Sequence, residues 1–98
     1  MHLKKAQKWV KDDWERHSKE RPEEYLQLIY LFEELGEMAE AIRKKHGKKT
    51  KKVKIDLEEE MGDVLISLCT VANQYDVDLE KAFLKSKKKI QQRHKKGL

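Results

Sequence analysis

The sequence is poor in the residues that interrupt helices. Its 98 residues include one proline, Pro22, and four glycines. Good helix formers such as Leu, Lys, Glu, Gln and Ala are abundant in the rest of the chain. Because long stretches contain no helix breaker, we expect an all-α fold.

Cysteine and long apolar runs are scarce as well. The single Cys69 excludes a disulfide within the chain, and its apolar neighbours indicate a packed thiol rather than a nucleophile. No segment approaches the roughly 20 apolar residues that a membrane-spanning helix requires, and no secretory apolar stretch follows the first residues. We therefore expect a cytoplasmic protein without a membrane segment.

Charged residues make up 42% of the chain and hydrophobic residues 38%, which allows one domain over residues 1–98 with a thin core. The formal net charge of +5 is unevenly distributed. Basic residues gather in 44–54 and 85–96, whereas the acids concentrate in 33–63. A basic rim beside an acidic cluster suits a polyanion that arrives with a metal ion, although a lysine run on a helix is more often a solvated face.

Apolar spacing divides the chain into four helices, which we expect over about 2–17, 22–45, 56–75 and 78–94. Pro22 suits the first turn of the second helix. Asp56 and Glu59 resemble a capping box, which places the start of the third helix at about residue 56. Residues 76–78 form a turn and a cap before the fourth helix.

Four helices with short connections are best packed as an antiparallel bundle. The third helix is apolar on almost all sides between Met61 and Ala72, which is more than four short helices can bury alone. We therefore predict a homo-oligomer, a dimer or a tetramer. Trp9 and Tyr75 are expected to be packing residues.

A short acidic motif occurs twice, as EELGE at 33–37 and as EEMGD at 59–63. Glycine inside a helix costs about 1 kcal/mol relative to alanine. Its recurrence at the same place in both motifs indicates close approach of another backbone or of a ligand.

Residues three positions apart lie on the same side of a helix, so Glu34 pairs with Glu37 and Glu60 with Asp63. On antiparallel helices the two pairs can face each other. Four crowded carboxylates repel one another unless a divalent cation neutralises them, and hard oxygen ligands favour Mg²⁺ or Mn²⁺. The alternative is that these are ordinary solvated glutamates, as we expect for Glu40.

The two motifs resemble the Glu-x-x-Glu and Glu-x-x-Asp signature of the MazG-like, all-α nucleoside triphosphate pyrophosphohydrolases. The similarity continues through residues 64–68 and 77–82 and covers about residues 26–93, most of the chain. This resemblance implies a four-helix fold, a dimer or tetramer, Mg²⁺ dependence, and hydrolysis of a nucleoside triphosphate to the monophosphate and pyrophosphate.

The resemblance also implies roles for individual residues. It implies that the metal ligands are Glu34, Glu37, Glu60 and Asp63, and that Glu37 is the candidate acceptor of the proton from water. Lys87 and Arg93 match the basic residues with which the family contacts phosphate or ribose, although Gln91 stands where an Asn is expected. Trp14 matches a tract that supplies a base-covering aromatic in some relatives, and it also lies on an apolar stripe that suits core packing.

Two alternatives stay open besides the enzyme. A basic helical protein that binds nucleic acid would explain the lysines but not the paired motifs. A bundle that binds a nucleotide without turning it over would keep the fold but not the activity. The sequence does not determine which base or sugar is preferred.

Overall fold

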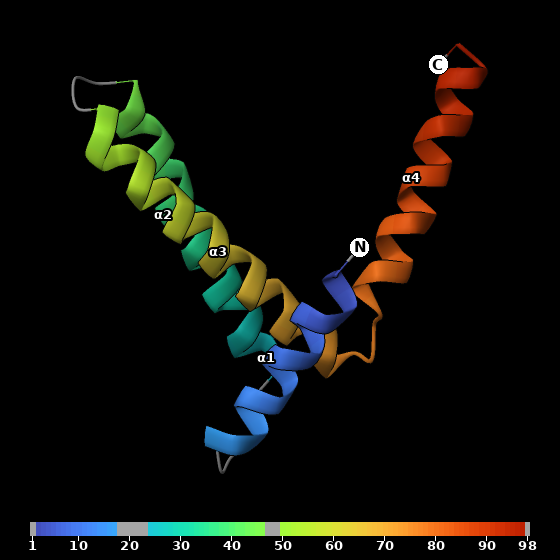
Figure 1. Cartoon of the computed structure of the whole chain (residues 1–98), viewed down its shortest axis with the longest axis horizontal. Helices are drawn as coiled ribbons and strands as arrows, with labels where there is room; N and C mark the ends of the chain where they lie inside the picture. Colours follow the sequence, from blue (N-terminus) through green and yellow to red (C-terminus); the bar gives the residue numbers. More distant parts are fainter. Residues whose placement is uncertain (1, 18–23, 47–49, 98) are drawn as a thin grey trace.

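The computed structural model describes residues 2–17, 24–46 and 50–97, and this part of the chain contains helices, turns and no strand. Its four helices are α1 (Leu3–His17), α2 (Glu24–Lys45), α3 (Thr50–Gln74) and α4 (Leu79–Lys95). Figure 1 shows their arrangement. The prediction of an all-α chain with four helices is confirmed, and none of the described helices is long and apolar enough to cross a membrane.

The third helix begins earlier than the sequence pattern suggested. α3 starts at Thr50, so position 56 lies inside the helix and is not its N-terminus. The segment 50–55, TKKVKI, contains neither Gly nor Pro, and a helix that has formed gains one hydrogen bond for each residue it adds. The N-terminus that we expected for the second helix, at Pro22, lies outside the described residues. The described part of α2 begins at Glu24.

α2 and α3 lie side by side as an antiparallel pair, and α1 packs across α3 (Figure 1). The buried apolar residues are small: Val10, Ala41, Cys69 and Ala72. Cys69 is only 1% exposed, so the prediction that its thiol is packed in the core is confirmed, and burial raises the pKa of this thiol. The core is thin, as the composition suggested.

α4 stands apart from the α2–α3 pair, and the chain has the outline of a V (Figure 1). It packs mainly on α1 and has no buried residue. The radius of gyration is 16.3 Å, whereas a compact domain of this length has about 13 Å. The prediction of an antiparallel four-helix bundle is therefore wrong for the single chain, because α4 packs mainly on α1 and leaves its own apolar side chains Phe83, Leu84 and Ile90 exposed.

The exposed surface confirms that the chain is open. It amounts to 8526 Å², whereas a compact monomer of 11.7 kDa exposes about 5,900 Å². Trp9 is 60% exposed and Tyr75 is 58% exposed, so neither of these expected packing residues is buried within the single chain. The other large apolar side chains that face solvent include Phe32, Leu65, Ile66, Phe83, Leu84 and Ile90.

The connection between α3 and α4 is tightly folded. Asp76 has a φ of 53°, the left-handed region in which a side chain is strained and which Asp and Asn tolerate best. Asp78 is the N-cap of α4 and accepts a hydrogen bond from the backbone N of Lys81 at 3.1 Å. The predicted turn and cap are confirmed.

The left-handed conformation of Asp76 leads to a prediction about stability. Asp76→Val should lower the free energy of unfolding by about 1–2 kcal/mol, because a β-branched residue is poorly accommodated there. Asp76→Asn should stay within about 0.5 kcal/mol of wild type, since Asn tolerates the same backbone. Urea denaturation at one protein concentration measures both, and equal stability of the Val variant would contradict the prediction.

Candidate metal centre

Two helices bring the acidic residues of the repeated motif together. Glu34 and Glu37 lie one turn apart on α2, and Glu60 and Asp63 lie one turn apart on α3. Because α2 and α3 pack along each other, the two motifs meet across the pair. The close group of carboxylates depends on this packing, because α2 contributes Glu34 and Glu37 and α3 contributes Glu60.

The carboxylates are close enough to share one cation. Glu34, Glu37 and Glu60 each offer one oxygen, and these oxygens lie within 4.8 Å of one another. Glu34 and Glu60 are half-buried, and Glu37 is exposed. Asp63 is outside this tight group, but its charge raises the pKa of both Glu34 and Glu60. All four predicted residues are therefore gathered in one electrostatic cluster.

The protonation of two carboxyls reflects this crowding. Loss of solvation raises the pKa of Glu34 first, and the charges of Glu37 and Asp63 raise it further. Loss of solvation also raises the pKa of Glu60, followed by a hydrogen bond with Glu37 and by that residue's charge. In the metal-free protein, these carboxyls therefore resist ionisation.

The structure provides a test of whether a cation fits. The Oε2 atoms of Glu34 and Glu60 are shielded from solvent and have no hydrogen-bond partner within the described residues. A shielded carboxylate oxygen without a partner is costly, and a cation would satisfy it. Carboxylate oxygens are the ligands that Mg²⁺ and Mn²⁺ prefer, so the residues present fit such an ion.

Both motif glycines face open space. A side-chain carbon added at Gly36 or Gly62 would meet nothing within 4 Å. We expected close approach of another backbone or of a ligand, and no backbone of the described residues approaches either glycine. The alternative, that they leave room for a ligand, is compatible with this open space.

Glu40 shows what an ordinary glutamate of α2 looks like. It is exposed and accepts a hydrogen bond from Nε of Arg43 at 3.0 Å. That pairing lowers the pKa of its carboxyl, in contrast to Glu34 on the same helix. Glu33, to which we gave no role, does belong near the cluster, because its charge contributes to the raised pKa of Glu34. Its place as the first residue of the repeated motif was the signal for it.

The predicted substrate residues are not part of this cluster. Lys87 and Arg93 are exposed on α4, the helix that stands apart from α2 and α3 (Figure 1). Trp14 lies on α1 and is half-buried, so part of its ring packs in the chain and part stays accessible. Within one chain, the acidic and the basic halves of the predicted site lie on different arms of the V.

The chain matches a known protein family over a segment that includes the acidic cluster. Residues 22–98 match the sequence profile of the MazG nucleotide pyrophosphohydrolase domain family. This span contains α2, α3 and α4, and hence every carboxylate of the cluster and the predicted substrate residues Lys87 and Arg93.

Two proteins of Bacillus subtilis (strain 168) are similar to the chain. The uncharacterized protein YvdC is 30% identical over an alignment of 103 positions that covers 95% of this chain and 96% of YvdC. The uncharacterized protein YpjD is 45% identical over 58 residues, which cover 56% of this chain and 52% of YpjD. The chain thus spans about half the length of YpjD and nearly all of YvdC.

The raised pKa of Glu60 predicts how stability depends on pH without metal. A carboxyl with a raised pKa in the folded state stabilises the protein below the pKa of the unfolded chain, and this stabilisation is lost as the pH rises through the raised value. Glu60→Gln removes the charge and nearly preserves shape. We expect the metal-free variant to melt at a higher temperature than wild type at neutral pH, with the gap closing towards about pH 4.

Glu58→Gln is the matched control for this experiment. Glu58 is an exposed residue of the same helix, so its change should alter stability by less than about 0.5 kcal/mol at neutral pH. Thermal melting in chelator over a pH series measures all three proteins. If Glu60→Gln melted below wild type at neutral pH, the carboxylates would not be in mutual repulsion.

Proposed function

Since the chain belongs to the MazG nucleotide pyrophosphohydrolase domain family, we propose that it hydrolyses a nucleoside triphosphate to the monophosphate and pyrophosphate in a Mg²⁺-dependent reaction. The observation that carries the proposal is the group of three carboxylate oxygens within 4.8 Å. Mn²⁺ is a possible substitute, because both ions prefer oxygen ligands. We place the reaction in the cytoplasmic nucleotide pool.

In this proposal Glu34, Glu37, Glu60 and Asp63 hold the ion. When bound, the ion would lower the pKa of a water ligand and offset the negative charge of the phosphates. Water attacks the α-phosphorus, the bond from that phosphorus to the bridging oxygen breaks, and pyrophosphate leaves. We assign Glu37 to accept the proton from water, because it is the exposed member of the tight group and lies beside the other two carboxylates.

We also propose a homodimer or homotetramer. The chain exposes 8526 Å² against about 5,900 Å² for a compact monomer, an excess comparable to the area that obligate partners cover. α4 carries seven Lys or Arg residues against one Glu, so it is complementary in charge to the acidic cluster of a second copy. A partner's α4 would then supply Lys87 and Arg93 to the phosphates, and Trp14 is the candidate for stacking on the base.

The same basic helix supports the second candidate, a nucleic-acid-binding protein. Exposed lysines on α4 would neutralise phosphates of DNA or RNA. This candidate leaves the orphaned oxygens of Glu34 and Glu60 unexplained, and so we consider nucleic acid the less suitable partner.

Incubation with a panel of common and modified nucleoside triphosphates separates these candidates. Pyrophosphate release that requires Mg²⁺ and stops in chelator supports the enzyme. Salt-sensitive binding of DNA or RNA without turnover supports the second candidate. Nucleotide binding without turnover would indicate a bundle that has kept the fold and lost the reaction.

Substitution of the proposed ligands tests the site directly. Glu37→Gln and Asp63→Asn should each lower kcat by at least about a hundredfold, because each removes a charged ligand while nearly preserving shape. Glu40→Gln, on the same helix but paired with Arg43, should change kcat by less than about threefold. Steady-state kinetics decides the matter, and a harmless Glu37→Gln would contradict our placement of the ion.

The role of α4 is tested by mixing two variant chains at a triphosphate concentration at which each variant alone turns over little substrate. Lys87→Ala should weaken triphosphate binding, whereas the neighbouring Lys88→Ala should do so much less if it lies on the solvated side. If the partner supplies Lys87, unfolding and refolding Glu37→Gln together with Lys87→Ala restores one intact site in each mixed dimer. We expect turnover to recover to about a quarter of wild type for random dimers. No recovery above the separate variants would place Lys87 outside the partner's site.

A further inference from the structure

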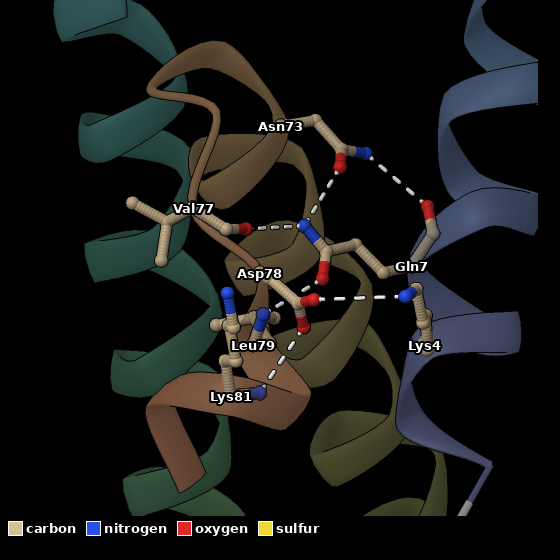
Figure 2. Close-up of polar contacts among 7 residues, drawn as sticks. All are labelled: Lys4, Gln7, Asn73, Val77, Asp78, Leu79 and Lys81. Atoms are coloured by element: carbon tan, nitrogen blue, oxygen red, sulfur yellow. Dashed lines mark hydrogen bonds and ion pairs between the residues drawn. The ribbon is translucent and has the colours of Figure 1, made fainter. Parts of the chain in front are cut away.

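The corner where α3 turns into α4 is held by a side chain from the other end of the chain. Figure 2 shows Gln7 of α1 directed into this corner. Its Nε2 donates to Oδ1 of Asn73 at 2.9 Å and to the backbone O of Val77 at 2.6 Å. Its Oε1 accepts from the backbone N of Leu79 at 2.9 Å. One side chain thus joins the last turn of α3, the connection and the first residue of α4.

Asn73 completes the contact in the opposite direction. Its Nδ2 donates to the backbone O of Gln7 at 3.2 Å, so the side chain of Asn73 binds both the side-chain amide and the backbone of Gln7. Both residues are partly buried. Burial strengthens their hydrogen bonds, and a polar group left without a partner there would lower stability. The exposed ion pair between Lys4 and Asp78, at 3.9 Å, adds little.

The start of α4 depends on this pair as well as on its own cap. The free N–H groups in the first turn of a helix need acceptors. Asp78 satisfies the N–H of Lys81, and Gln7 satisfies that of Leu79. Gln7 therefore acts as a second cap that comes from α1, and it links the first turn of α4 to α1.

Few other contacts among the described residues hold α4 in its direction. α4 has no buried residue and makes its main helix contact with α1 (Figure 1). A helix without a buried face can swing about its N-terminal connection unless that connection is rigid. The polar contacts at the corner are therefore the described interactions best placed to set its angle.

We propose that Gln7 and Asn73 are positioning residues that fix the direction of α4 and thereby the place of its basic side chains. This direction of α4 is a property of the single chain. Its consequence for the substrate rests on the proposed function, in which the side chains of α4 bind the phosphates.

Spin-label distances test the direction of α4. Labels on Lys44→Cys of α2 and Lys85→Cys of α4 report the opening of the V, because both positions are exposed and native Cys69 is buried. Labelled chains are diluted into an excess of unlabelled wild-type or variant chains, so that distances within one chain are recorded. Gln7→Leu and Asn73→Leu should shift or broaden the distance distribution beyond the wild-type width, while circular dichroism shows that the helices remain.

Two further variants make the result specific. Gln92→Leu repeats the chemical change at an exposed position of α4 and should leave the distances unchanged. Gln7→Glu keeps the size and the acceptor for Leu79 but loses both donors, so it should broaden the distribution even if Gln7→Leu does not fold. Wild-type distances in Gln7→Glu and Asn73→Leu would overturn the proposal and assign the angle of α4 to other contacts.

Kinetics separates this proposal from the proposed function. If wild type turns over a triphosphate, Gln7→Leu should raise KM more than it lowers kcat, because the metal ligands of α2 and α3 are untouched while phosphate binding is weakened. A loss confined to kcat would contradict a positioning role for the substrate. If wild type shows no turnover, the proposed function fails while the distance measurements still decide whether the amide pair orients α4.

Discussion

Electrostatic repulsion between carboxylates across the α2–α3 pair is the constraint on which the rest of the structure depends. Two helices bring Glu34, Glu37 and Glu60 together, with Asp63 close enough to raise the pKa of two of them. The apolar core that opposes this repulsion consists of small buried residues. Such a site is retained at a cost in stability, which is typical of a site kept for binding.

The unpaired carboxylate oxygens indicate that the cluster is suited to a cation. Oε2 of Glu34 and Oε2 of Glu60 are shielded yet unpaired within the described chain, so a cation would relieve both the unmade contacts and the crowded charge. Membership of the MazG nucleotide pyrophosphohydrolase domain family is consistent with this chemistry. The open space beside Gly36 and Gly62 leaves room for a ligand next to the carboxylates.

The open shape of the chain separates the acidic cluster from the basic helix α4. The acids lie on α2 and α3, while the basic residues lie on α4, which stands apart and exposes Phe83, Leu84 and Ile90. A second copy would cover apolar surface and bring opposite charges together in one step. Gln7 then has importance beyond its own helix, since its contacts with Asn73 and Leu79 set where α4 projects.

The sequence by itself determined that the chain has four helices and that Glu34, Glu37 and Glu60 belong to one acidic cluster. Both follow from local rules: helix formers without breakers, apolar spacing, and the same-side placement of residues three apart. Its local rules failed at Asp56, where a pattern typical of a cap lies within a helix that begins at Thr50. Only the tertiary structure decided that α4 leaves the α2–α3 pair and that Gln7 meets Asn73 across the chain. Those outcomes depend on contacts between residues distant in sequence, and helical periodicity carries no information about which distant faces will meet.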